Sequence, residues 1–184
     1  CWINFIYLRL MKKIFLIFLM ALYHLISIAT PVDKSKLLSS LRLAEFYITS
    51  GNYEKASTNR NLGMELFRQL GADNDLNTIS MLHKVSHAYS EKGMYKEAIE
   101  TESLLVNVFP HAQPNNKHDY ALYLNDLSFY LMGDDKIELA ADYINKALSL
   151  IENTKDVNLA IIYIRAAEIF SDASLNRLDL SIEY

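Results

Sequence analysis

Two short stretches of this 184-residue chain repeat one another at a spacing of about 42 residues. Gly51-Asn-Tyr53-Glu-Lys-Ala56 returns as Gly93-Met-Tyr95-Lys-Glu-Ala98, and Asp135-Lys-Ile137-Glu-Leu-Ala140 follows at the same distance as a diverged third copy. A fixed period of this length is typical of stacked supersecondary units that bury their apolar faces against one another. The repeat therefore constrains the fold strongly. It constrains the function less, because a stack of repeats offers a binding surface but does not identify the partner.

Apolar residues recur at helical spacing between these stretches, which predicts an all-α chain of antiparallel helix pairs. We expect four repeats over residues 33–71, 75–110, 117–152 and 156–184, with the last one cut short inside its second helix. Glycine after an apolar stripe ends a helix, and Pro110 is predicted to end another. His111 to His118 is then the longest loop, and Asp119 is the expected cap of the helix that follows.

Small residues fall at matching places in the predicted helices, where two helices of a pair must approach closely. The first helices carry Ala44, Ser86, Ser128 and Ala167, and the second helices carry Ala56, Ala98, Ala140 and Ser181. Large apolar residues flank them at fixed phase. This alternation predicts packing between helices and carries no chemistry of its own.

These positions resemble the tetratricopeptide repeat family. The pattern Leu-Gly/Ala-x-x-Tyr, Gly-x-Tyr-x-x-Ala, Ala-Leu and Pro is met unevenly, and the third repeat lacks the Gly and the Tyr pair. The residues that carry the resemblance are Ala44, Tyr47, Gly51, Tyr53, Ala56, Ser86, Tyr89, Gly93, Tyr95, Ala98, Pro110, Leu127, Ser128, Ala140, Ala147, Ala167, Phe170 and Ser181. The family's usual period is about 34 residues. The longer period of this chain looks like the longer-helix subtype of kinesin light chains and of bacterial sensory and regulatory proteins.

The resemblance implies an α-solenoid, wound as a right-handed superhelix, whose first helices line a concave face that binds protein or peptide segments. On that face it places seven residues, which predict a groove of mixed polar and apolar character: Glu45, Ile48, His83, His87, Asn125, Phe129 and Glu168. Packing against a neighbouring helix is an equally good reading of Phe129. Some family members bind the terminal carboxylate of a partner with a cluster of Lys, Arg and Asn side chains. Among the residues predicted for the groove only Asn125 could take part in such a cluster, so carboxylate binding of this kind is disfavoured.

No metal site, cofactor or catalytic site is predicted. His83 and His87 are four residues apart and could share a metal ion, but zinc needs three or four converging ligands, which only His111 and His118 could complete. The carboxylates of Glu97 to Glu102 and of Asp134-Asp135 are interpreted as solvated or helix-end charges. Phosphate-binding, nucleophile-elbow and metalloprotease motifs are absent from the sequence.

The N-terminal stretch over residues 1–29 is predicted to contain an export signal. Met11-Lys12-Lys13 precedes an apolar run over residues 14–28, and Ser27-Ile-Ala29 supplies small residues for cleavage after Ala29. We expect Met11 to be the true start, with residues 1–10 upstream of it. Cleavage is preferred because the run is shorter than the roughly 20 residues of a spanning helix, although an uncleaved anchor stays open.

Charge and cysteine content narrow the remaining possibilities. Without the three basic residues of the leader, 15 Lys and Arg face 22 Asp and Glu, a net charge of −7 for residues 30–184. Such an acidic region repels phosphate backbones, so no nucleic-acid partner is expected. Cys1 is the only cysteine, so a mature chain has no disulfide framework. We expect a bacterial periplasmic location, with membrane attachment only through an uncleaved leader or a helix further downstream.

Three functions remain open at this level. The leading hypothesis is an exported helical-repeat scaffold for protein or peptide binding, forming the N-terminal part of a longer protein. The alternative is the periplasmic sensor region of a membrane histidine kinase or DNA-binding regulator, and a third is a self-associating array. We expect no enzyme activity within these residues, although a kinase could follow them.

Overall fold

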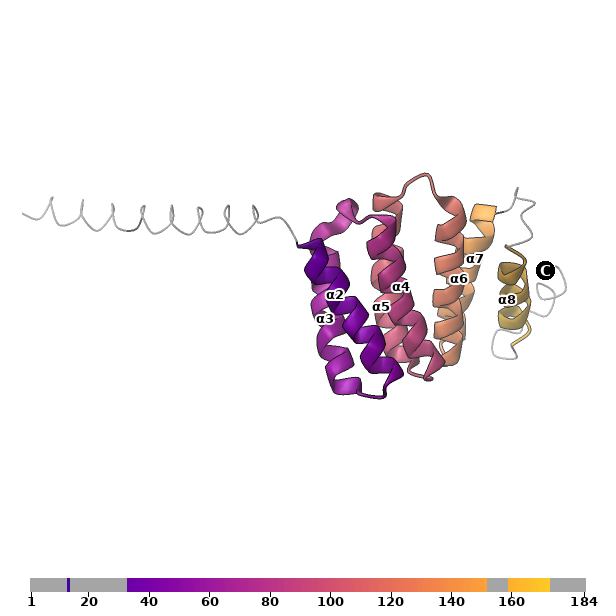
Figure 1. Cartoon of the computed structure of the whole chain (residues 1–184). Helices are drawn as coiled ribbons and strands as arrows, with labels where there is room; N and C mark the ends of the chain where they lie inside the picture. The colour runs from indigo at the N-terminus through magenta and orange to yellow at the C-terminus, as the bar shows by residue number, and fades with distance from the viewer. Residues whose placement is uncertain (1–12, 14–32, 152–158, 173–184) are drawn as a thin grey trace, which may run out of the picture. The chain divides into compact units, whose positions relative to one another are not determined.

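The computed structural model describes residues 13, 33–151 and 159–172 of the chain, and from Asp33 onward these residues belong to one compact unit. Every regular element in this part is helical (Figure 1). The elements are α2 (Lys34–Thr49), α3 (Tyr53–Leu70), the short 3-10 helix η1 (Gly71–Asp73), α4 (Leu76–Glu91), α5 (Tyr95–Ala112), α6 (Lys117–Gly133), α7 (Ile137–Ile151) and α8 (Ala160–Phe170).

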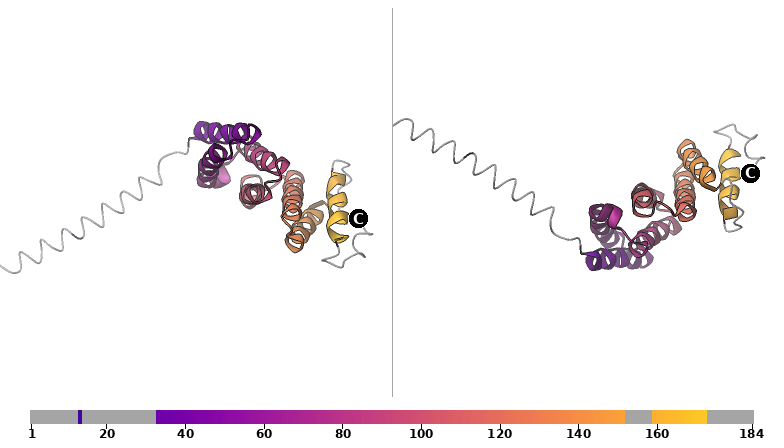
Figure 2. Two further views of the ribbon diagram at one scale, coloured as in Figure 1. Left: turned by 90° about the horizontal axis from the view of Figure 1, so that it is seen from below. Right: turned by 90° about the horizontal axis from the view of Figure 1, so that it is seen from above.

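Consecutive helices pack as antiparallel pairs, and the pairs lie side by side (Figures 1 and 2). Within the pairs, α2 packs on α3, α4 on α5 and α6 on α7. Between the pairs, α2 also contacts α4, α5 contacts α6, and α8 packs against α6 and α7. This packing confirms the predicted all-α, pairwise repeat architecture.

The turns between paired helices adopt the same backbone conformation in each of the first three repeats. Gly51, Gly93 and Asp135 have φ angles of 78°, 69° and 60°, all in the left-handed region. In each turn the next residue's N–H closes the helix end, from Asn52 to Tyr47 O at 2.8 Å and from Met94 to Tyr89 O at 3.0 Å. Lys136 bonds Leu131 O at 2.9 Å in the same way. This is the Schellman pattern, which satisfies carbonyls that a helix end leaves open. In the third repeat Asp135 therefore takes over the role of the missing glycine.

The small residues predicted at helix crossings are buried in the described repeats. Ala44, Ala56, Ala98, Ala140, Ser86 and Ser128 have no exposed surface. Gly63 extends the rule, because a Cβ at this position would lie 2.8 Å from Leu41 Cγ, too close for any real contact. In α8 the fully buried small residue is Ala166, whereas Ala167 is only half-buried. The buried small residue of α8 therefore lies one position before the predicted one. Ser181 lies outside the described residues.

Two predicted boundaries change around the longest loop. Pro110 lies inside α5, which continues to Ala112, since a proline in the last turn costs only one backbone hydrogen bond. Asn116, not Asp119, caps α6: its Oδ1 accepts the Asp119 N–H at 3.2 Å, and its Nδ2 donates to Asp119 Oδ2 at 2.7 Å. The loop shrinks to residues 113–116, and the two histidines predicted in it belong to α5 and α6.

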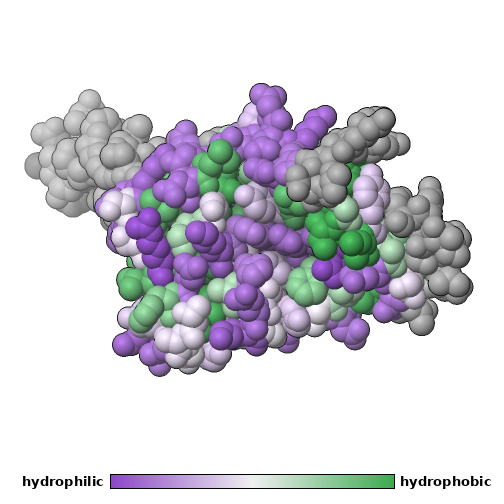
Figure 3. All heavy atoms as spheres, turned by 45° about the vertical axis from the view of Figure 1, so that its right-hand side comes forward, coloured by the Kyte–Doolittle hydropathy of each residue, from purple (hydrophilic) through white to green (hydrophobic). Residues whose placement is uncertain are grey.

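The described core consists of two clusters of buried side chains, one mainly from α2 to α5 and the other mainly from α6 to α8. Its largest fully buried side chains are aromatic: Tyr89, Tyr130, Phe67, Phe109 and Phe170. On the face drawn in Figure 3 polar residues predominate, and apolar residues gather toward the C-terminal end of the described chain. None of the described helices combines the length and hydropathy needed to cross a bilayer. Apart from Lys13, the predicted export leader lies outside the described residues, as does the second helix of the fourth repeat.

Candidate partner-binding groove

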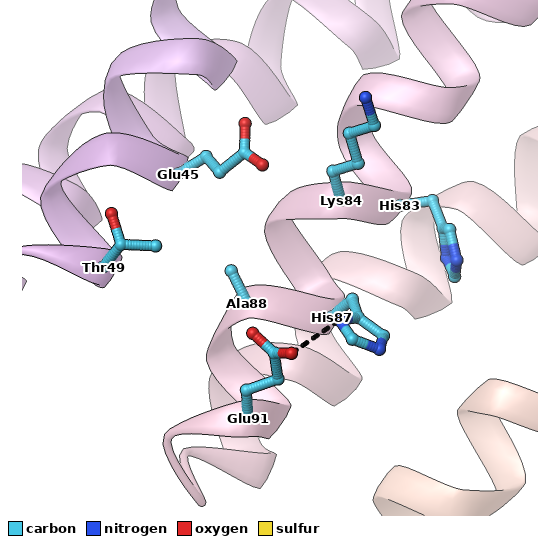
Figure 4. Close-up of a pocket in the computed structure, with 7 residues that line it drawn as sticks. All are labelled: Glu45, Thr49, His83, Lys84, His87, Ala88 and Glu91. Carbon is cyan, nitrogen blue, oxygen red and sulfur yellow. Dashed lines mark ion pairs between the residues drawn. The ribbon is translucent and has the colours of Figure 1, made fainter.

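A cleft separates the first helices of the first two repeats, α2 and α4 (Figure 4). We call it the α2–α4 groove; its cavity measures about 230 Å³, and it is lined by Glu45, Thr49, His83, Lys84, His87, Ala88 and Glu91. Glu45 is half-buried, whereas Lys84, His87 and Glu91 are exposed. The floor is made by Ala88, whose short side chain leaves room between the two helices.

Three of the seven residues predicted for a binding face line this groove, namely Glu45, His83 and His87. The prediction for Ile48 and Asn125 needs correction, since Ile48 has no exposed surface and Asn125 only 2%. Ile48 lies on the α2 face that packs into the core, and Asn125 donates from its Nδ2 to Asp126 Oδ1 at 3.1 Å. Neither side chain offers a surface to a partner.

The other two predicted residues belong to a separate corner between α6 and α8. Phe129 is half-buried there under the Arg165 guanidinium, whose Cζ lies 4.2 Å from the ring centroid. It also meets the Tyr95 ring edge-on at 6.2 Å. Glu168 is exposed and pairs with Arg165 at 2.5 Å. Phe129 therefore packs against neighbouring helices, which is the alternative reading that the sequence left open.

Four residues of the α2–α4 groove were not predicted from the sequence: Thr49, Lys84, Ala88 and Glu91. The period itself contained a signal for two of them. Thr49 and Glu91 are one repeat period apart, and each stands about one helical turn after a predicted groove residue. Positions one turn apart share a helix face, so extending the predicted face by a turn would have found both.

A buried charged cluster lies beside the groove, where α4, α5 and α6 meet. Glu102 of α5 has no exposed surface, and its carboxylate accepts a short hydrogen bond from the Ser86 hydroxyl. His83 Nδ1 lies 3.2 and 3.3 Å from the two Glu102 oxygens, and because a carboxylate only accepts, this nitrogen carries the proton. His83 Nε2 lies 3.6 Å from Asp126 Oδ2 on α6. His83 thus bridges carboxylates from two other helices.

The surroundings raise the pKa of two members of this cluster, His83 and Asp126. Burial of the ring lowers the pKa of His83, but the hydrogen bond to Glu102 and the charges of Glu102 and Asp126 outweigh it, so the net shift is upward from 6.5. Burial raises the pKa of Asp126 above its ordinary 3.8, against the opposing charge of His83. The cluster is a structural joint between repeats, since its polar atoms point at one another.

The burial of Glu102 corrects the interpretation of this acidic stretch as solvated charge. One signal was present: Ala98, Glu102, Leu105 and Phe109 follow helical spacing, and the other three are core residues. A carboxylate within an apolar stripe indicates a buried, partnered group. The sequence could not show which residues of α4 would partner it.

A second cavity of about 210 Å³ lies between α3, α4 and α5. Arg60 lines it and is almost fully buried; its Nη2 donates to Glu100 Oε2 at 2.9 Å and to Asn61 Oδ1 at 3.1 Å. Its guanidinium also sits 5.4 Å from the Tyr89 ring centroid. Arg60 is therefore engaged in holding the first two repeats together.

Metal binding finds no support in this geometry. Among the described residues no group of three or more His, Cys, Asp or Glu side chains is placed to hold a metal ion. The His83 and His87 rings are 6.4 Å apart, and His87 instead pairs with Glu91 at 3.7 Å. His118 pairs with its neighbour Asp119 at 2.9 Å.

Comparison with known proteins agrees with the fold. Residues 36–103 match the family model described as tetratricopeptide repeat, so this part of the chain is similar to that family. Crystal structures of putative kinesin light chain TPR-like repeats from Podosopora anserina share its fold. A form with a single substitution matches with a TM-score of 0.56 and 16% identity over 81% of this chain and 71% of that one. Another form matches with 0.56 and 15% over 82% and 72%. A search of the curated proteins gives no match.

Proposed function

We propose that the chain is a non-catalytic scaffold that binds a protein or peptide segment in the α2–α4 groove. Tetratricopeptide repeats generally bind protein segments and are typically non-catalytic. The observation that carries the proposal is the cleft itself, an open cavity between first helices that contains a half-buried carboxylate, Glu45. Helical repeats use extended surfaces of this kind for extended partners.

The test fills the groove and measures binding of the full chain to a displayed peptide library. Thr49→Trp places a large side chain at the groove edge, and Thr58→Trp makes the same change at an exposed position of α3 outside the groove. We expect peptides selected by the natural chain to lose binding to the Thr49 variant and keep it with the Thr58 variant. Equal binding by both variants would remove the groove from the function.

We further propose that the chain is exported to the bacterial periplasm. Support comes from the sequence of the leader, with Lys12 and Lys13 before an apolar run and small residues up to Ala29. Expression with a reporter that is active only outside the cytoplasm tests this, together with mass spectrometry of the mature N-terminus. An inactive reporter would refute export, and a retained leader would favour the membrane-attached alternative.

A further inference from the structure

We infer that the α2–α4 groove selects a segment carrying a basic side chain, lysine or arginine, with Glu45 and Glu91 as the partners of the cation. This inference rests on the proposed function, because it names the chemistry of the segment that the groove would bind. Four observations at the groove carry it.

The first observation is the state of Glu45. Its carboxylate is half-buried in the groove and has no ion-pair or hydrogen-bond partner within the described part of the chain. A carboxylate that loses part of its hydration without a partner is costly. A basic group entering the groove would supply the missing partner.

The second observation is the convergence of two helix ends. Thr49 is the last residue of α2 and Glu91 the last of α4, and both line the same cavity. The C-terminal end of a helix carries a partial negative charge of about half an elementary charge, which favours cations. Glu91 adds a full negative charge at this end.

The third observation is the cluster beside the groove, which adds negative charge to this side of α4. His83 carries one positive charge at most, and it lies between Glu102 and Asp126, so the three groups together are negative when both carboxylates are ionised. The field of this excess acts on the groove, because His83 also lines it.

The fourth observation concerns the opposing charges. Lys84 stands two turns before Glu91, about 10 Å along the helix, at the end of the groove where Glu45 also lies and away from Thr49 and Glu91 (Figure 4). His87 is already paired with Glu91 at 3.7 Å. With the histidines counted as neutral, two carboxylates, Glu45 and Glu91, face one lysine, Lys84, in the groove lining, which leaves an excess of negative charge that a lysine or arginine of the segment complements.

The experiment measures binding of fluorescein-labelled peptides to the full chain by fluorescence polarisation. Three matched peptides share one Ser/Leu sequence and differ only in a central Lys, Gln or Glu. We expect the Lys peptide to bind about tenfold more tightly than the Gln peptide, and the Glu peptide to bind least. Added salt should reduce the advantage of the Lys peptide, because exposed charges are screened.

Variants then assign the effect to the groove. Glu45→Gln with Glu91→Gln should remove the preference for Lys, whereas Glu54→Gln, an exposed glutamate on α3, should retain it. Glu45→Lys should invert the order and favour the Glu peptide. Circular dichroism of each variant confirms that the helices are formed.

The possible outcomes distinguish the charge preference from binding in the α2–α4 groove itself. Equal binding of all three peptides, lost in Thr49→Trp, would overturn the charge preference and leave groove binding in place. Tightest binding of the Glu peptide would overturn it as well. A preference for Lys that persists in the Glu45 and Glu91 variant would place the cation elsewhere. Failure of every peptide to bind at any accessible concentration would count against both.

Discussion

Removal of the Glu102 carboxylate tests how α4 and α5, the two helices of the second repeat, are joined. The side chain is fully buried and accepts hydrogen bonds from Ser86 Oγ and His83 Nδ1. Breaking a buried ion pair by deleting one partner costs about 3–5 kcal/mol. Without Glu102, the Ser86 hydroxyl still donates to the carbonyl oxygen of His83 at 2.7 Å, and His83 still pairs with Asp126. Glu102→Ala should therefore cost about 3 kcal/mol, at the lower end of this range.

Urea unfolding at neutral pH, followed by far-UV circular dichroism, measures this cost as a lower midpoint. At about 2–4 °C per kcal/mol for a chain of this size, the melting temperature should fall by about 6–12 °C. Glu102→Gln keeps an acceptor oxygen and should cost less, about 1–2 kcal/mol. Glu65→Ala removes an exposed glutamate that pairs with Arg68 and accepts a hydrogen bond from Gln69, and its cost should stay within about 0.5 kcal/mol.

A double-mutant cycle with His83→Gln checks the mechanism. If the pair is the source of the cost, Glu102→Ala should be less damaging in the His83→Gln chain, with a coupling of about 1.5–3 kcal/mol. A cost of Glu102→Ala no larger than that of Glu65→Ala, or a coupling near zero, would refute the reasoning.

Three further predictions concern pH, packing and the third turn. Because the pKa of His83 is raised in the folded chain, the stability that its protonated form contributes is fully present below pH 6.5 and is lost as pH rises through the raised pKa. The free energy of unfolding should therefore fall over that pH window in the natural chain and in the control His87→Gln, which changes an exposed histidine. It should change less in His83→Gln. Gly63→Ala should lower the urea midpoint, because the new Cβ would collide with the Leu41 side chain. Overpacking costs about 1–3 kcal/mol, which exceeds the gain of about 1 kcal/mol in helix propensity. An unchanged or higher midpoint would show that the close contact between Gly63 and Leu41 does not limit stability. Asp135→Gly should raise the free energy of unfolding by about 0.5–1 kcal/mol, and with it the urea midpoint, because φ is 60° at this position. A lower midpoint would mean that the aspartate itself stabilises the turn.

The sequence by itself determined the repeat period, the helix pairs and the residues at their crossings. These features are readable because each depends on a few neighbouring residues. Gly51 and Gly93 close helices through bonds within one turn, and Ala98 and Ala140 mark crossings that recur at the same phase. Periodicity then repeats the local information, and a match in several copies removes the ambiguity of any single one.

Only the tertiary structure decided which members of a predicted helix face reach solvent. Ile48 and Asn125 share the phase of accessible residues, yet neighbouring helices bury them. Glu102 became a buried joint because α4 brings His83 and Ser86 to it while α6 supplies Asp126. Burial and ion pairing depend on the approach of segments that are distant in sequence, and helical spacing carries no information about that distance.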